Sequence, residues 1–133
     1  MDAKQALDRA EELLSKGEEY SAKSIVLRYR LVPGQSAQDY FRWAKLCEDL
    51  ALDKLALECI SAALFKDPDN LQYLLMQADI NYRLGNLSDT ARILRHILEV
   101  KESATVRDFL AKVLKEMGQL GAACAVSGEK ENR

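Results

Sequence analysis

The feature of this sequence that most constrains its fold is a repeat with a period of 34 residues. Ala10, Ala44 and Ala78 follow one another at steps of 34, and Ala111 comes after a step of 33. Three further columns keep this phase: Gly17, Ala51, Gly85 and Gly118; Ala22, Ala56, Thr90 and Ala123; and Val26, Ile60 and Leu94, which ends at Ser127. A period of this length predicts one supersecondary unit that is used four times along the chain.

Each copy reads as two helices joined by a tight turn. Alanine at a fixed place on each helix lets two backbones approach closely, and the Gly or Ala column marks the turn between them. Apolar residues keep a helical spacing on both sides of the turn at Gly85, at Ile80, Leu84, Leu87, Ile93, Leu94, Ile97 and Leu98. With only 2 Pro and 6 Gly, the chain is poor in the turn formers that an all-β fold needs.

Capping residues stand where the repeat predicts helix starts. Ser36 with Asp39 resembles a capping box with the shorter acid, and Pro68 ends one helix before Asn70 can cap the next. Val32-Pro33-Gly34 has the same role in the preceding copy. The predicted helices cover residues 2–16, 19–31, 37–50, 53–66, 70–84, 87–100 and 104–117, with a short and weak eighth helix near 119–127.

The pattern resembles the tetratricopeptide repeat (TPR), a helix-turn-helix of this length with small residues at three places and a Pro before the next copy. The best matching copy offers Tyr40, Trp43, Ala44, Cys47, Ala56, Ile60, Ala63 and Pro68. Departures from the family pattern are Gln77 and Asn81 in the third copy, and Arg9 and Arg107 at normally apolar places of the terminal copies.

The resemblance implies an all-α fold, a right-handed α-solenoid of stacked helix-turn-helix hairpins (a TPR-like superhelix). Residues 1–128 would form a single TPR-like domain, with hairpins at 3–36, 37–70, 71–103 and 104–128. Residues 129–133 are expected to be a disordered tail. The amphipathic capping helix that usually ends a TPR array is not evident after the fourth copy.

The resemblance also implies a concave groove, lined by the first helix of each hairpin, that binds an extended peptide or a partner's helix. By repeat phase the groove residues are Phe41, Lys45, Glu48 and Asp49; Leu75, Asp79, Tyr82 and Arg83; and Asp108, Lys112 and Lys115. Such a surface would hold apolar side chains at its aromatic and leucine positions, and its Lys and Arg side chains would attract acidic groups. The alternative is that these residues form ordinary solvated and inter-repeat helix faces.

One TPR subclass clamps the C-terminal carboxylate of heat-shock chaperones with Lys, Asn and Arg side chains from three first helices. The first helices of the first two hairpins carry no Asn, so this function is disfavoured. Trp43 and Tyr40 lie at helical spacing on the face that the repeat buries, and we interpret them as core residues instead of a stacking platform.

Composition argues against several other functions. Nineteen basic and 21 acidic side chains give a formal charge of −2 without a basic stripe, so nucleic acid is not an expected partner. The chain has no run of about 20 apolar residues, and its N-terminus lacks the plan of a signal peptide, so we expect a cytoplasmic protein that does not bind membranes.

The sequence offers no recognisable catalytic or metal-binding constellation. Cys47, Cys59 and Cys124 lack C-x-x-C spacing and read as reduced, mostly buried residues, and His96 is the sole histidine. No glycine-rich phosphate-binding loop is present. We therefore expect no cofactor, no metal and no enzymatic activity.

Two functions stay open at this point. The first is a non-catalytic protein-protein interaction module that binds its partner in the groove. The second is a self-associating scaffold or oligomerisation domain, in which the small and apolar stretch 120–126 of the under-capped last hairpin packs on a copy of itself.

Overall fold

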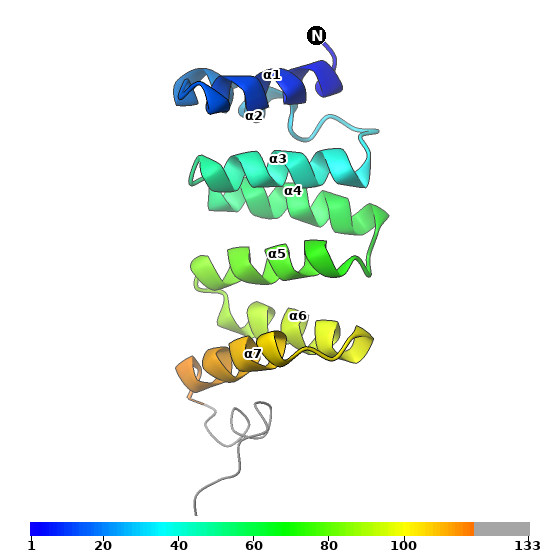
Figure 1. The fold of residues 1–133 in the computed structure, drawn as a ribbon, viewed down its shortest axis with the longest axis vertical. Helices are drawn as coiled ribbons and strands as arrows, with labels where there is room; N and C mark the ends of the chain where they lie inside the picture. The colour runs from blue at the N-terminus through cyan, green and yellow to red at the C-terminus, as the bar shows by residue number, and fades with distance from the viewer. Residues whose placement is uncertain (119–133) are drawn as a thin grey trace, which may run out of the picture. The chain divides into compact units, whose positions relative to one another are not determined.

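The computed structural model describes residues 1–118, and helices account for most of this part of the chain (Figure 1). They are α1 (Ala3–Ser15), α2 (Glu19–Tyr29), α3 (Ala37–Asp49), α4 (Asp53–Lys66), α5 (Leu71–Arg83), α6 (Leu87–Val100) and α7 (Ala104–Glu116). Each bound lies within two residues of its predicted position, and residues 1–118 contain no strand. The predicted eighth helix and the predicted tail lie outside the described residues.

The chain forms two compact units, which divide within α5. The first unit, Met1–Tyr73, holds α1 to α4, and the second begins at Leu74. In the first unit α1 packs on α2, α3 packs on α4, and both α1 and α2 contact α3. In the second unit α6 packs on α7. The single-domain layout and its hairpin boundaries stay a prediction.

Side-chain caps begin the first helix of each hairpin. The Ser36 hydroxyl accepts a hydrogen bond from the backbone N–H of Asp39, as predicted, and Asn70 accepts one from Tyr73. The reciprocal bond of a capping box is formed instead at α1, where Asp2 and Gln5 cap each other. The Asp39 carboxylate is used elsewhere, in ion pairs with Lys4 and Arg42.

The Gly or Ala column supplies the left-handed residue that ends each first helix. Ala51 has φ 58° and Gly85 has φ 80°. After α3 the N–H of Leu52 bonds to the carbonyl of Cys47 at 2.8 Å, and the N–H of Ala51 bonds to that of Glu48 at 3.0 Å. This pair of bonds is the Schellman motif, which satisfies the last carbonyls of a helix and reverses the chain in very few residues.

The core of the first unit is built from the small-residue columns around one large aromatic. Ala10, Ala44, Trp43 and Ile60 are fully buried, and Tyr40 is 7% exposed, which confirms Trp43 and Tyr40 as core residues. Cys47 and Cys59 are buried free thiols, as predicted, and a hydrogen bond with Cys47 together with burial raises the pKa of Cys59. Cys124 lies outside the described residues.

A buried glutamine ties the connection between hairpins to this core. Gln35 is 7% exposed, and its Oε1 accepts a hydrogen bond from the Trp43 indole N–H at 2.6 Å. Its amide nitrogen donates to the carbonyls of Val32 at 2.9 Å and Arg30 at 3.1 Å. Since the Gln35 amide and the Trp43 N–H satisfy each other and the neighbouring carbonyls, Gln35 stabilises the segment that leads from α2 into α3.

The second unit repeats the design with different side chains. Ala78, Ile80, Leu94, Val113 and Leu114 are fully buried, and polar residues replace some of the apolar groups expected in this copy. One of these, Asn81, is 5% exposed; its amide donates to the Gln77 carbonyl at 3.0 Å, and its Oδ1 accepts from the Asn86 amide at 3.1 Å. These hydrogen bonds explain why a polar residue is tolerated at a normally apolar position of the copy.

Candidate binding surface

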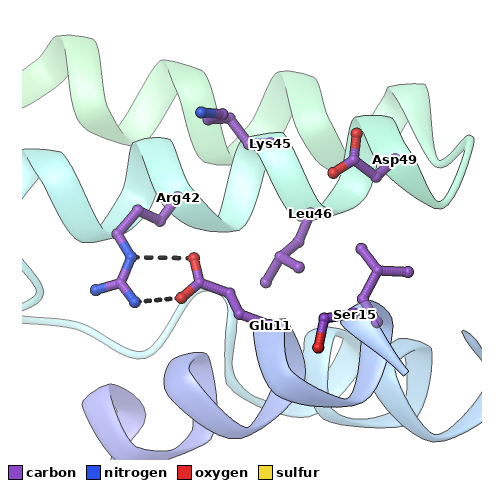
Figure 2. A pocket seen from close by; sticks show the side chains of 7 residues that line it. Glu11, Ser15, Arg42, Lys45, Leu46 and Asp49 are labelled. Carbon is purple, nitrogen blue, oxygen red and sulfur yellow. Dashed lines mark hydrogen bonds and ion pairs between the residues drawn. The ribbon is translucent and has the colours of Figure 1, made fainter. Parts of the chain in front are cut away.

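A pocket of about 360 Å³ lies between α1 and α3 in the first unit (Figure 2). We call it the α1–α3 pocket; its lining residues are Glu11, Leu14, Ser15, Arg42, Lys45, Leu46 and Asp49. The apolar part of the lining comes from Leu14 and Leu46. Carboxylates of Glu11 and Asp49 and cations of Arg42 and Lys45 surround it. The pocket therefore combines an apolar patch with both signs of charge.

Arg42 crosses between the two helices that form the pocket. Its Nη2 lies 2.8 Å from the Asp8 carboxylate, and its Nε donates to Glu11 Oε2 at 3.1 Å, with a second bond from Nη2 to Glu11 (Figure 2). These hydrogen bonds, chiefly those to Glu11, raise the pKa of Arg42 against the opposing effect of burial. Lys4 adds a parallel ion pair to Asp39 at 3.1 Å. Several charges thus hold α1 and α3 at a fixed spacing.

Phe41 and Lys45, both predicted groove residues, are brought together on α3. The Lys45 Nζ lies 5.5 Å from the centroid of the Phe41 ring, and the Tyr73 ring centroid lies 4.9 Å from that of Phe41. We call Phe41, Lys45 and Tyr73 the Phe41 cluster. Burial, with a smaller contribution from Asp67, raises the pKa of Tyr73. Because Lys45 also lines the α1–α3 pocket, the cluster adjoins the pocket at this residue.

The second unit has an aromatic cluster of its own between α5 and α7. The rings of Tyr82 and Phe109 meet edge to face with centroids 5.3 Å apart, and Lys112 Nζ lies 5.1 Å from the Tyr82 centroid. The Tyr82 hydroxyl donates to Glu116 at 2.6 Å. We call Tyr82, Phe109, Lys112 and Glu116 the Tyr82 cluster. Tyr82 and Lys112 were predicted groove residues, and the structure brings them into contact.

The remaining predicted groove residues stand outside these two clusters. Glu48 and Asp79 are half-buried, Leu75 is 38% exposed, and Arg83 and Asp108 are exposed. Asp49 lines the α1–α3 pocket, and Lys115 is exposed on α7. The assignment of the whole set to one partner-binding groove stays a prediction.

Sequence reasoning missed Asp8, Glu11 and Arg42, which join α1 to α3, and Glu116 in the Tyr82 cluster. A signal for two of these contacts was present in the repeat. Asp8 and Arg42 are 34 residues apart, and so are Tyr82 and Glu116. Complementary side chains one period apart meet within each unit, because α1 packs beside α3 in the first and α5 contacts α7 in the second.

Within residues 1–118, no group of three or more His, Cys, Asp or Glu side chains is arranged to hold a metal ion. Over the same residues, no helix has the length and apolar character needed to cross a membrane. His96 lies on α6, where its Nδ1 is 3.7 Å from the Glu99 carboxylate.

No protein-family model matches the sequence, and no curated protein sequence matches it. Solved structures do. A crystal structure of MamA superposes with a TM-score of 0.72 at 14% identity, and covers 88% of this chain and 69% of that chain. A second MamA crystal structure gives 0.74 at 10% identity, covering 93% and 68% of the two chains, and a MamA RS-1 double mutant gives 0.74 at 11%, covering 93% and 70%.

The fold is TPR-like. Its helices carry a TPR-like repeat and match MamA, a TPR-like helical solenoid, so the predicted all-α, TPR-like fold class is confirmed. At 10–14% identity the likeness to MamA shows the fold and leaves the partner of this chain to be argued from its own residues.

Proposed function

We propose that this chain is a non-catalytic protein-binding module that holds a peptide or helix of a partner on the first helices of its hairpins. The observation that supports this most directly is the α1–α3 pocket. Its volume of about 360 Å³ falls at the lower end of the range of about 300–1,000 Å³ that is usual for ligand pockets. An apolar side chain of the partner enters the pocket and covers Leu14 and Leu46.

Charges around the pocket orient the partner. Lys45 offers a cation beside the Phe41 ring, and Asp49 offers a carboxylate at the same rim. Arg42 is already engaged by Glu11 and Asp8, so its role is to hold the pocket open in the free protein. A preformed site binds with little ordering cost, which favours affinity.

The Tyr82 cluster supports a second contact of the same kind in the other unit. Its aromatic pair would contact apolar side chains of a partner segment, and the adjacent lysine and carboxylate would pair with charged side chains of that segment. Helical repeats use such surfaces for binding instead of catalysis, and we assign the chain no enzymatic activity and no cofactor.

The alternative, self-association through residues 120–126, depends on a stretch outside the described residues. It stays a prediction, as does the cytoplasmic location.

Site-specific photocrosslinking in the source cells tests the pocket. Lys45 is replaced by a benzophenone amino acid, with Ser88 on α6 replaced in a matched control, because Ser88 is exposed and does not line the pocket. A partner crosslinked from position 45, absent from position 88 and lost when Ser15→Trp fills the pocket, supports the proposal. A partner that is captured equally with and without Ser15→Trp contradicts it.

A further inference from the structure

A second surface stands out on α2, in the first unit. Tyr20 is 85% exposed, Leu27 is 51% exposed, and Leu31, just beyond the C-cap Arg30, is 42% exposed. Tyr20, the exposed Ser24 and Leu27 follow one another on α2 at steps of four and three residues, the a and d spacing of a helix-pairing seam. Leu31 comes four residues later, directly after the helix has ended. We call Tyr20, Ser24, Leu27 and Leu31 the α2 seam.

The repeat provides an internal control for this surface. One period later the equivalent residues are Lys54, Glu58, Ser61 and Phe65, and two periods later they are Ser88, Arg92, Arg95 and Glu99. All eight are exposed, and only Phe65 is apolar. The hairpin therefore forms without apolar side chains at these places. Three large apolar residues in one copy are not required by the fold, and such an exposed stripe is typical of a binding surface.

The charges beside the seam restrict what can cover it. Lys23 and Arg28 are exposed and flank the seam at the g and e positions, and no acidic residue occurs between residues 20 and 31. Arg30 is held by Glu58 at 2.9 Å. If a second copy of α2 paired with the seam, parallel or antiparallel, Lys23 and Arg28 would face Lys23 and Arg28 of that copy, and these like charges would repel. A helix with acidic flanks would meet them with opposite charge.

We propose that the α2 seam docks an amphipathic helix of a partner protein whose apolar stripe is flanked by Asp or Glu. The partner's apolar side chains pack on Tyr20, Leu27 and Leu31, and its carboxylates pair with Lys23 and Arg28. This contact is separate from the α1–α3 pocket. It does not depend on the function proposed for the pocket.

A displayed library of helical peptides three heptads long provides the probe. Leu is fixed at a and d, and the e and g positions are left free. We expect selection on the full chain to enrich Asp and Glu at e and g. The selected peptide should shift the amide resonances of α2. Tyr20→Ser with Leu27→Ser should weaken it by at least about tenfold, because these positions carry serine elsewhere in the repeat and the fold tolerates it.

Charge reversal and pocket blocking complete the test. Lys23→Glu with Arg28→Glu should reverse the selection toward Lys and Arg at e and g, and Ser15→Trp should leave binding to the seam unchanged. Enrichment of peptides without a preference for charge at e and g overturns the proposal. So does a selected peptide that binds the serine variant as tightly as the wild type, or one that shifts the amide resonances of α3 in place of those of α2. Two further results would also overturn it: seam-dependent binding to phosphatidylserine vesicles in place of the peptide, or seam-dependent dimerisation in sedimentation.

Discussion

Replacing Ala51 by glycine should stabilise the protein, against the usual effect of removing an alanine methyl. Ala51 ends the first helix of its hairpin at φ 58°, where the same column has Gly85 at φ 80°. The left-handed conformation costs an L-residue about 1–2 kcal/mol. Glycine also raises the conformational entropy of the unfolded chain, which offsets about 0.4–1 kcal/mol of this gain. The midpoints of these two ranges differ by about 0.8 kcal/mol, and we expect the free energy of unfolding to rise by about this amount.

Urea and thermal denaturation followed by circular dichroism measure this difference. For a chain of 133 residues, we expect the midpoint temperature to rise by about 2–4 °C. Gly85→Ala should lower the free energy of unfolding. An added Cβ there meets no atom within 4 Å, so the cost comes from the left-handed backbone conformation and not from a clash. Ala62→Gly, within α4, should lower stability by about 1 kcal/mol. If Ala51→Gly destabilises as Ala62→Gly does, the reasoning about the turn is wrong.

Two further predictions concern polar groups outside the binding surface. Gln35→Leu should lower the free energy of unfolding by about 2–4 kcal/mol, because it leaves the buried Trp43 N–H and the Arg30 carbonyl without the partner that Gln35 supplies. A loss below about 1 kcal/mol in urea denaturation would contradict this. The hydrogen-bonded ion pair with Arg107 lowers the pKa of Glu102 below 4.5. The ion pair therefore stabilises the fold in full above pH 4.5. This stabilisation is lost as the pH falls through the lowered pKa that Glu102 has in the folded protein. A carbon-detected NMR titration should show Glu102 titrating below 4.5, and Arg107→Gln should return it toward 4.5.

The helices could be predicted closely because their limits depend on local chemistry. Ser36 and Asn70 cap the helices that they precede, and the turn column marks where first helices end. Periodicity also identified the core residues Trp43 and Ala44, since the repeat buries the same column in each copy.

The candidate binding surface was harder to predict. The phase of the repeat tells which face of a helix a residue lies on, but it does not tell which side chains pair with those of the neighbouring helix. Phase placed Phe41 and Lys45 on a common face, where they do meet. It could not show that Arg42 would be drawn to Glu11 and Asp8, since this choice depends on side-chain lengths and on the spacing of α1 and α3. The exposure of the α2 seam was not predicted either, because the sequence alone does not show which residues of one copy remain uncovered when the helices pack.

Affinity for the crosslinked partner tests the central claim, that the first-helix face binds proteins, most directly. Calorimetric titration would compare the wild type with Ser15→Trp, which fills the α1–α3 pocket, and with Ser88→Trp, which adds the same ring at an exposed place on α6. The account predicts at least about a tenfold loss of affinity for Ser15→Trp and none for Ser88→Trp. Equal affinity of all three proteins, with circular dichroism showing each one folded, would contradict it.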